Sequence, residues 1–427
     1  MRILVVGGGG REHALCSALR KSAFVEELFC APGNPGIAEL ADCLPVSSGE
    51  IVEIADLAEK LQMDLTVVGP ELPLSLGIVD EFGKRDMPIF GPTRLAAQIE
   101  SSKVFSKEFC RRHRIPTAES VVCSSADEAR KAVKKFGFPA VLKADGLAGG
   151  KGVHIVESKE EMQRALGLFF DERVFGSAGD RVLVEEFLRG AEASFLVVSD
   201  GETVVPLPTA RDYKKIFDGD RGPNTGGMGA HSPAGLLDSA DASHVLKEIV
   251  YPAIRGLAAE NRPFRGVLYA GIIQTESGPK CLEFNARLGD PEAEVMLPRI
   301  SSDVAALLVE ATRGELSKFP PLDVRPEACL GVVLASAGYP GSYEKGKRIE
   351  GLNEAARLPH VEIFHAGTAR DGDGVVTAGG RVLVVTATAP GMTEAAARVY
   401  DAADVIRFEG KTLRRDIGLT GVRESRL

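Results

Sequence analysis

The seven cysteines of this chain show no pairing pattern. They are scattered, odd in number and never spaced as CxxC, so the sequence indicates neither a disulfide framework nor a zinc site. We expect free thiols that are buried or partly buried. These cysteines are Cys16, Cys30, Cys43, Cys110, Cys123, Cys281 and Cys329.

Long apolar runs and an excess of basic residues are also missing. The first apolar run, residues 3–6, is too short for a signal-peptide core, and no other run approaches the length of a membrane span. The net charge is −9, whereas a surface that binds DNA or RNA normally carries a basic excess. We therefore expect a cytoplasmic protein that binds neither a nucleic acid nor a membrane.

What is present is the composition of an ordinary globular protein, with 44% hydrophobic and 26% charged residues. A chain of 427 residues exceeds what one hydrophobic core usually fills, so we expect several sub-structures. Because the chain is acidic overall, an anionic substrate would need local lysines and arginines.

The most informative stretch is VLKADGLAGGKGVHIV, residues 141–156. Its pattern predicts a strand over 141–143, a flexible glycine-rich loop, and a second strand over 153–156. The glycines remove side chains where backbone N–H groups would approach an anion, which favours phosphate as the ligand. The loop glycines are Gly146, Gly149, Gly150 and Gly152.

Lys143 and Lys151 supply positive charge on either side of this loop. It is not a Walker A loop, because Lys151 is followed by Gly152 rather than Ser or Thr and the loop lies between strands. The alternative is a mobile glycine hairpin that carries an ordinary surface lysine.

The N-terminus predicts a strand over 3–6, a glycine turn over 7–10 and a helix. The dinucleotide pattern GxGxxG is incomplete, because its third glycine position falls on Glu12 or His13. A helix N-terminus after such a turn can still hold a simple phosphate, although the glycines could also serve only tight packing. For Arg11, Glu12 and His13 we expect capping and surface roles.

The first ~100 residues repeat a short apolar strand followed by a Gly/Pro loop, with helical stretches between, which predicts a parallel α/β unit. Loops at the carboxyl ends of parallel strands line the ligand crevice. We therefore expect three loops to converge on one pocket, namely those at Gly8 to Gly10, Gly33-Asn34 and Gly69-Pro70-Glu71.

The next segment predicts a small α+β lid around the glycine loop. Residues 96–114 have a helical pattern on which Lys103 and Lys107, four apart, share a face. Further helices are predicted over 126–136 and 160–170.

Two strand patterns follow the lid. Residues 181–188 predict a strand, and residues 194–207 predict a hairpin around an Asp-Gly turn. Residues 211–233 hold too many Gly, Pro, Asp and Asn residues for a regular element, and a loop of that length suggests a binding function. The alternative is a disordered surface excursion.

Residues 266–298 predict two strands around a turn, and the second strand carries Glu283 and Asn285. A spacing of two places both oxygen ligands on one face, while Leu282 and Phe284 are expected to point into the core. This hard-oxygen pair suits Mg²⁺ that is otherwise held by phosphates and water. The alternative is a polar strand end unrelated to a metal.

The remaining sequence predicts a helix over 303–313 and then mostly β structure, with one late helix over 393–406. The domains expected are residues 1–103, 104–325 with a lid at about 120–190, and 326–427. The fold class is α/β and α+β multidomain, with a Rossmann-like N-terminal parallel sheet and a mostly β C-terminal domain.

Taken together, these stretches resemble the ATP-grasp superfamily and, within it, the phosphoribosylamine–glycine ligase family. The resemblance covers essentially the whole chain, and its long strings in the correct order are far more specific than one glycine loop. The strings are VVGGGGREHA, PGNPG, VGPELPL, KADGLAGGKGV, DGDRGPNTGGMGAHSP, YAGI, EFNARLGDPE, YPGSYEKGK and AGGRVL.

The resemblance implies ATP-dependent joining of glycine to 5-phosphoribosylamine in purine synthesis, through a glycyl phosphate that the amine attacks. The implied cofactors are ATP and Mg²⁺ or Mn²⁺, with Glu283 and Asn285 as metal ligands. The implied partners are small molecules only, and we expect a monomer that self-associates at most weakly.

The resemblance also implies the nucleotide site. Lys103 and Lys143 would meet the phosphates, the lid loop would cover them, and Glu192 would contact the ribose. The ATP-binding set is Lys103, Lys143, Gly146, Gly149, Gly150, Lys151, Gly152, Glu185, Glu186, Phe187, Leu188 and Glu192.

The substrate and catalytic residues are assigned from the same resemblance. Arg287 and Asp290 are candidates for the glycine carboxylate and the incoming amine, and Asp212 for completing their pocket, with Lys143 as the fourth catalytic candidate. The substrate-binding set is Gly8, Gly9, Gly10, Asn34, Asn224, Thr225, Gly226, Gly227, Met228, Gly229 and Arg287.

Three positions depart from the family pattern. Residues 210–214 read ARDYK where AQDHK is common, so no histidine stands there, although Asp212 and Lys214 remain. Leu288 stands where an aromatic residue is usual, and Gly149 replaces an alanine. These changes could alter pocket shape or loop mobility without removing the phosphate or metal ligands.

Three other functions compete with this one. Another ATP-grasp ligase, such as a purine or biotin-type carboxylase, would share the nucleotide and metal sites but should lack the NTGGMG string. A nicotinamide-dependent oxidoreductase is favoured only by the first glycine turn. A non-catalytic nucleotide sensor is disfavoured because both Glu283 and Asn285 are present.

Overall fold

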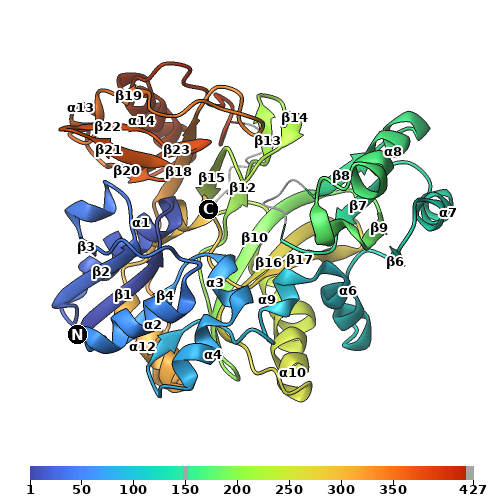
Figure 1. Cartoon of the computed structure of the whole chain (residues 1–427), viewed down its shortest axis with the longest axis horizontal. Helices are drawn as coiled ribbons and strands as arrows, with labels where there is room; N and C mark the ends of the chain where they lie inside the picture. Colours follow the sequence, from blue (N-terminus) through green and yellow to red (C-terminus); the bar gives the residue numbers. More distant parts are fainter. Residues whose placement is uncertain (148–151, 420–427) are drawn as a thin grey trace.

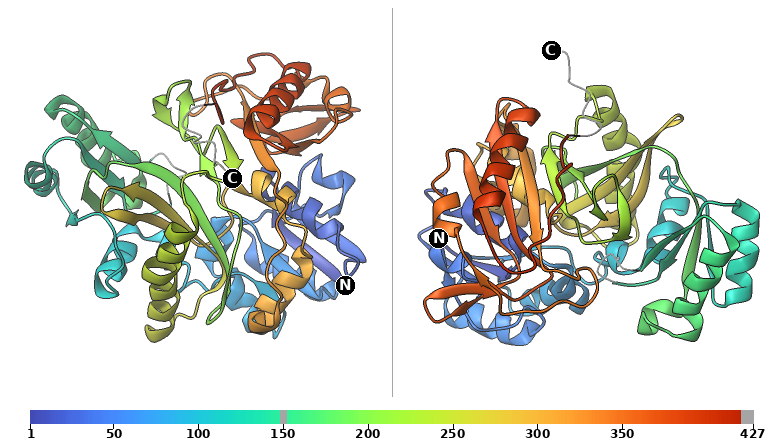
Figure 2. Two further views of the ribbon diagram at one scale, coloured as in Figure 1. Left: turned by 180° about the vertical axis from the view of Figure 1, so that it is seen from behind. Right: turned by 90° about the horizontal axis from the view of Figure 1, so that it is seen from above.

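The computed structural model describes residues 1–147 and 152–419. Figure 1 shows the N-terminal parallel sheet beside a central antiparallel sheet, with a small lid at the far end of the central sheet. The C-terminal region lies next to the N-terminal sheet, and Figure 2 shows it on a different side of the central sheet from the lid. Among the described residues, no helix combines the length and apolar character needed to cross a membrane.

The N-terminal sheet has the strand order β3-β2-β1-β4-β5, and every pairing in it is parallel. Its apolar strands are buried because helices cover them, which confirms the predicted parallel α/β unit. The strands are β1 (Arg2–Gly7), β2 (Glu27–Pro32), β3 (Asp42–Cys43), β4 (Leu65–Val68) and β5 (Ile89–Phe90), and the helices are α1 (Gly10–Arg20), η1 (Ile37–Glu39), α2 (Ile51–Lys60), α3 (Glu71–Leu76) and α4 (Ile78–Gly83).

The central sheet is antiparallel, with the order β11-β10-β16-β17. Its apolar residues join those of the N-terminal sheet in two shared hydrophobic clusters, so the two regions are packed together. The elements are β10 (Ala191–Asp200), β11 (Val204–Pro206), α9 (Ser239–Val245), η4 (Leu246–Val250), α10 (Tyr251–Ala259), β16 (Arg265–Thr275), β17 (Gly278–Asn285), α11 (Glu292–Met296), η5 (Leu297–Arg299), α12 (Val304–Arg313) and η6 (Leu316–Lys318).

The lid is a four-stranded antiparallel sheet, β6-β9-β7-β8, covered by two helices around its own small core. The predicted hairpin around the glycine loop is confirmed, because β7 and β8 pair antiparallel from Ala140–Val156 to Lys143–Val153. The elements are β6 (Ser120–Cys123), α7 (Ala126–Phe136), β7 (Ala140–Ala144), β8 (Val153–Val156), α8 (Lys159–Leu166), η2 (Gly167–Asp171), η3 (Gly176–Gly179) and β9 (Val182–Glu186).

The single helix predicted over 96–114 is wrong. The chain forms two helices, α5 (Gln98–Ser101) and α6 (Lys103–Arg112), with extended backbone at Ser102. The Ser102 side chain accepts a hydrogen bond from the Phe105 N–H and so caps α6. This break places Lys103 in the first turn of α6.

The irregular loop predicted over 211–233 is also wrong in part. It folds into short strands. Gly219, in the left-handed region, allows the tight turn between two of them, and Gly222, also left-handed, lies inside the second of these strands, where the pairing shifts register. The strands are β12 (Arg211–Asp212), β13 (Lys215–Phe217), β14 (Arg221–Asn224) and β15 (Gly229–Ser232).

The C-terminal region is mostly β, as predicted, with one long helix. Its main sheet, β12-β15-β18-β23-β20, takes its first two strands from residues 211–232, so the C-terminal region is built directly onto that segment. The other elements are β18 (Ala328–Ala335), β19 (Arg348–Ile349), α13 (Leu352–Ala355), β20 (Val361–His365), β21 (Thr368–Asp371), β22 (Gly374–Thr377), β23 (Arg381–Ala389) and α14 (Met392–Val405).

Candidate active site

Two buried lysines share one buried glutamate where the lid meets α6. Oε2 of Glu185 on β9 lies 2.8 Å from Nζ of Lys143 on β7, and its Oε1 lies 3.1 Å from Nζ of Lys107 on α6. Burial lowers the pKa of Lys143, but Glu185 and Glu283 outweigh it, so the pKa is raised and the ammonium stays charged.

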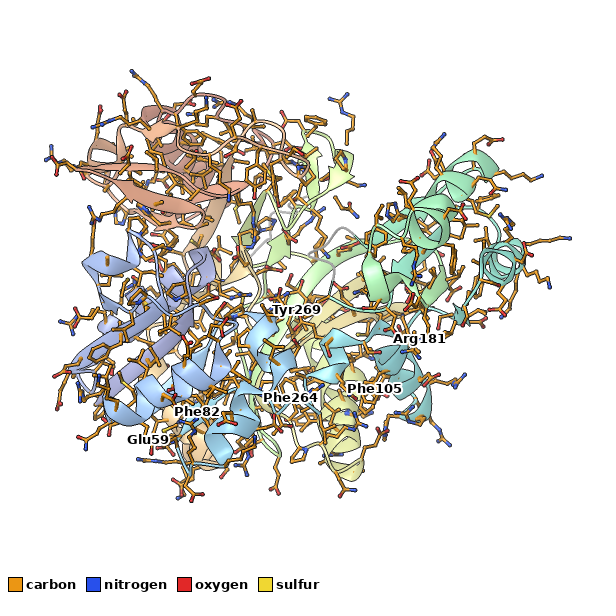
Figure 3. The ribbon with its side chains drawn as sticks, viewed as in Figure 1. Glu59, Phe82, Phe105, Arg181, Phe264 and Tyr269 are labelled. Carbon is orange, nitrogen blue, oxygen red and sulfur yellow. The ribbon has the colours of Figure 1, made fainter. Side chains whose placement is uncertain are left out.

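Lys103 reaches the start of the glycine loop, where its Nζ donates to the Gly146 carbonyl at 2.9 Å. Asp145 fixes this geometry, because its Oδ1 accepts from the Ser102 hydroxyl at 2.8 Å and from the Val104 N–H at 3.1 Å. Burial lowers the pKa of Lys103, although the Glu283 carboxylate opposes that shift. Figure 3 labels Arg181, which pairs with Asp145 from the lid side.

Glu283 lies on β17 among these cations. Burial raises its pKa, but Lys214, Lys143 and Lys103 together lower it to about 2. Nζ of Lys214 lies 3.9 Å from Glu283 and 3.7 Å from Glu192, so it spans the two acids that sequence analysis assigned to metal and ribose. The carboxylate is therefore ionised throughout the neutral range.

The predicted burial of β17 is only half right. Phe284 lies in the core, but Leu282 is half-buried and lines the pocket beside Glu283. The pairing of β16 with β17 shifts register beside Gly271, which gives a β-bulge, so the strict alternation of faces is interrupted there.

Glu283 and Asn285 are both carried by β17, and both are half-buried. The described residues contain no cluster of three or more His, Cys, Asp or Glu side chains that could hold a metal ion. Two oxygen ligands next to several ammonium groups fit a divalent ion that takes its other ligands from a polyphosphate and water.

A small polar pocket adjoins Glu283 between β10 and β16. Near the middle of the molecule, where Figure 3 labels Tyr269, the Tyr269 hydroxyl lies 2.9 Å from the Ser194 hydroxyl, which donates to Glu292 at 2.9 Å. Its polar lining is Glu192, Ser194, Asp212, Lys214, Tyr269 and Glu283.

Asp212, predicted as catalytic, lies in this pocket. Burial and the Glu292 carboxylate raise its pKa well above the ordinary value, and its Oδ1 has no hydrogen-bond partner among the described residues. Gly227 has φ +116°, and a Cβ there would lie 2.7 Å from that oxygen. The 224–229 loop therefore closes directly over Asp212.

Arg287, the candidate for the glycine carboxylate, is held by two acids in this structure. Its Nη2 lies 2.9 Å from Glu100, and its Nε lies 3.3 Å from Glu71 at the start of α3. Arg11 also reaches this region, because its Nη1 donates to the Leu288 carbonyl at 3.2 Å. Two guanidinium groups thus meet where the N-terminal and central sheets join.

The first turn of α1 is more deeply buried than its sequence predicts. Glu12 does cap the helix, since it accepts from the Gly9 N–H at 2.7 Å, but Arg11, Glu12 and His13 are all buried, so the expected surface role is wrong. Glu12 packs against the backbone of Gly7 and Gly69. The apolar neighbours of these charged residues were the one signal that could have indicated burial.

The three N-terminal loops converge around this turn, as predicted. The Asn34 side chain is fully used within the protein: its amide donates to the carbonyls of Gly8 at 3.0 Å and His365 at 2.8 Å. Its Oδ1 accepts from the N–H groups of Gly36 and Ile37. Asn34 therefore ties the glycine turn to strand β20.

Sequence analysis did not include Arg381 of the C-terminal sheet among the predicted site residues. Its Nη1 donates to the carbonyls of Gly226 at 2.7 Å and Asp290 at 2.8 Å, and Asp290 Oδ1 lies 3.1 Å away. It brings together the Asp290 loop and the 224–229 loop, both of which sequence analysis had assigned to substrates. The string AGGRVL contained this arginine, but no spacing rule connected it with Asp290.

The predicted ATP-binding set includes residues 185–188, but strand β9 ends at Glu186, whose carboxylate accepts from the Glu119 N–H at 3.0 Å. Phe187 and Leu188 follow it and are half-buried. Gly152 accepts a hydrogen bond from the Ala144 N–H at 2.8 Å across the hairpin. Gly149, Gly150 and Lys151, also predicted here, lie outside the described residues.

Three family models match successive parts of the chain. They are the phosphoribosylglycinamide synthetase N domain over residues 1–100, its ATP-grasp (A) domain over 101–293 and its C domain over 329–420. Together they span nearly the whole sequence.

Curated relatives match over the full length. The chain is 44% identical over 424 residues to the phosphoribosylamine–glycine ligase of Halalkalibacterium halodurans, covering 99% of this chain and 98% of that protein. It is 45% identical over 429 residues to that of Pseudomonas aeruginosa, covering 100% and 99%.

Two solved structures also resemble this chain over nearly its whole length. The crystal structure of phosphoribosylamine–glycine ligase from Thermotoga maritima has 37% identity and a TM-score of 0.84, covering 97% of this chain and 100% of that one. The biotin carboxylase domain of 2-oxoglutarate carboxylase from Hydrogenobacter thermophilus, solved with MgADP and bicarbonate, has a TM-score of 0.73 at 18% identity, covering 96% and 91%. At that identity the second likeness shows the shared fold alone.

Proposed function

The chain belongs to the phosphoribosylglycinamide synthetase family, and on that premise we propose that it joins glycine to 5-phosphoribosylamine with hydrolysis of ATP. The products are glycinamide ribonucleotide, ADP and phosphate, in purine biosynthesis. The observation that carries the proposal is the convergence of Lys103, Lys143 and Lys214 on Glu283, next to a small pocket with polar lining.

The nucleotide is proposed to lie between the lid hairpin and β17. Lys103 and Lys143 would contact its phosphates, which would replace Glu185 and the Gly146 carbonyl as their counter-groups. The segment Glu185 to Leu188 would line the adenine, and Glu192 would contact the ribose. We therefore propose that this chain binds ATP.

Glu283 and Asn285 would hold Mg²⁺ or Mn²⁺, whose positive charge, when bound, would offset that of the phosphates. The protein's own contribution is electrostatic. Three ammonium groups keep Glu283 ionised and surround the place where negative charge builds up during transfer.

We propose that the glycine carboxylate attacks the γ-phosphorus in line, which breaks the bond to the β-phosphate oxygen and gives glycyl phosphate and ADP. The amine of phosphoribosylamine then attacks the acyl carbon, phosphate leaves, and the amine proton passes to a nearby carboxylate. Such chemistry depends on positioning and charge neutralisation rather than on a nucleophilic side chain.

Arg287 is proposed to orient the glycine carboxylate, exchanging its long contact with Glu71 for the substrate. Asp290, Asp212 and residues Asn224 to Gly229 are proposed to enclose the amine. Burial and the Glu292 carboxylate raise the pKa of Asp212, so its carboxyl group holds a proton more readily than an ordinary aspartate and is suited to proton exchange. The sugar phosphate would lie at Gly8 to Gly10, at the N-terminus of α1.

Several predictions stay open beside these roles. They are the domain boundaries at 103/104 and 325/326, a monomer with at most weak self-association, and a cytoplasmic location. None of the steps proposed above depends on them.

The test is ADP release, measured with glycine, phosphoribosylamine and other amino acids, each offered alone and in combination. The proposal expects full ADP release only with glycine and phosphoribosylamine together. A carboxylase would instead need bicarbonate, so bicarbonate-dependent ADP release without glycine would overturn the proposal in favour of that alternative.

A further inference from the structure

Arg381 connects the C-terminal sheet to two loops of the central region. It opens strand β23, and its Nη1 is within hydrogen-bond distance of both the Gly226 carbonyl, at 2.7 Å, and the Asp290 carbonyl, at 2.8 Å. The Asp290 carboxylate lies 3.1 Å from the same nitrogen. One nitrogen thus contacts both loops, which sets the distance between them.

The other backbone group of Gly226 is held by the C-terminal region as well. The Gly226 N–H donates to the Tyr339 hydroxyl at 3.0 Å. A Cβ on Gly226 would lie only 3.1 Å from Cζ of Arg381, so the guanidinium rests directly on the backbone of this residue. Both backbone polar groups of one loop residue, Gly226, are therefore bound by C-terminal side chains.

The opposite side of the loop faces the substrate pocket. A Cβ on Gly227 would lie 2.5 Å from Cδ of Pro291 and 2.7 Å from Oδ1 of Asp212. The loop is therefore enclosed between Arg381 and Tyr339 on one side and the Asp212 pocket on the other, and a shift of either support would change the width of that pocket.

Electrostatic attraction keeps the Arg381 guanidinium in place beside the Gly226 loop. Burial lowers the pKa of Arg381, but Asp290, Tyr339 and Glu294 outweigh it and raise the pKa, so the guanidinium remains a cation. A planar guanidinium with several donors can hold two acceptors in a fixed geometry, which a single ammonium does less well.

We infer that Arg381 is a positioning residue for the amine substrate, because it fixes the gap between the Gly226 loop and Asp290. Tyr339 supports it by holding the N–H of the same loop residue. This inference rests on the proposed function, which places phosphoribosylamine between those loops. It assigns to the C-terminal sheet an effect on amine binding that is separate from nucleotide binding.

The experiment compares KM for phosphoribosylamine, glycine and ATP in Arg381→Ala, Arg381→Lys and Tyr339→Phe. Arg348→Ala is the matched control, since Arg348 is an exposed arginine on strand β19 of the separate sheet β19-β22-β21. We expect Arg381→Ala to raise KM for phosphoribosylamine by about 100-fold, the size of loss that a small misplacement causes. KM for ATP should stay within about twofold, since Arg381 does not touch the nucleotide site.

Added guanidinium ion should restore part of the activity of Arg381→Ala, and Arg381→Lys should lie between the two. A merely structural role would not respond to guanidinium and would raise all three KM values together, and that result would overturn the inference. Tyr339→Phe keeps the ring and tests the same loop if Arg381→Ala fails to fold; an unchanged KM for phosphoribosylamine in that variant would also contradict the inference.

The controls separate this inference from the proposed function. If the unmodified protein and Arg348→Ala release no ADP with glycine and phosphoribosylamine, the proposed function fails. If both turn over normally while the Arg381 variants match them in every KM, only the role of Arg381 fails.

Discussion

Nζ of Lys143 lies 2.8 Å from Oε2 of Glu185, and both side chains are more than nine-tenths buried. The other carboxylate oxygen is paired with Lys107 in the same way. One carboxylate therefore compensates two buried ammonium groups where the lid meets α6.

Removing that carboxylate should destabilise the protein. Glu185→Gln leaves two buried lysines without a counter-charge, and breaking a buried pair typically costs about 3–5 kcal/mol. Urea unfolding measures the change in the free energy of unfolding. Glu119→Gln is the control, because Glu119 pairs with Lys135 at 3.4 Å on the exposed surface, where about 0–1 kcal/mol is expected. Equal losses in both variants would contradict the account.

Glu283→Ala should abolish ligation, because the loss of a metal ligand leaves the triphosphate charge uncompensated. Steady-state turnover over a range of Mg²⁺ concentrations measures this. Glu276→Ala, in the exposed turn of the same hairpin, should keep its activity. Near-normal turnover of Glu283→Ala in excess Mg²⁺ would refute the assignment.

Glu294 gives a pH-dependent prediction. It is fully buried, neither carboxylate oxygen has a hydrogen-bond partner among the described residues, and burial followed by repulsion from Asp290 raises its pKa. A raised pKa in the folded state means that its stabilising contribution is complete below the ordinary pKa and is lost as the pH rises through the folded value.

Glu294→Gln carries no titrating proton, so it should gain stability relative to the parent as the pH rises. Tm measured from pH 5 to pH 9 tests this, with the exposed Glu354→Gln as control. A Tm difference between parent and Glu294→Gln that stays constant with pH would contradict a raised pKa.

The same glutamate constrains Gly10. A Cβ on Gly10 would lie 2.4 Å from Oε1 of Glu294, so Gly10→Ala should cost about 1–3 kcal/mol through overpacking. In a Glu294→Ala background the clash is gone and the cost of Gly10→Ala should fall sharply. A double-mutant cycle in urea measures this coupling, and additive effects of the two substitutions would disprove the contact.

Much of the fold could be predicted from local patterns. The hairpin of β7 and β8 and helix α7 follow from periodicity and turn residues, because their apolar faces meet a core that is close in sequence. The break at Ser102 could not be predicted, since it depends on a contact with Asp145 across 43 positions. Strand β15 was missed because its pairing partner, β18, comes about a hundred positions later.

The candidate site likewise contains residues that the sequence could indicate and one that it could not. Glu283 and Lys143 stand in recognisable strings, and the structure brings them together with Lys103. Arg381 belongs to a different sheet and contacts the backbone of the other loops, so no spacing in the sequence could indicate it.

The central claim is that the terminal phosphate of the nucleotide lies between the lid hairpin and Glu283 and there meets the glycine carboxylate. A crystal structure with a non-hydrolysable ATP analogue, Mg²⁺ and glycine tests it most directly. The account predicts the γ-phosphate within contact of Lys103 and Lys143, the ion on Glu283 and Asn285, and the glycine carboxylate facing the phosphorus. A triphosphate anywhere else, or glycine bound away from it, would contradict the account.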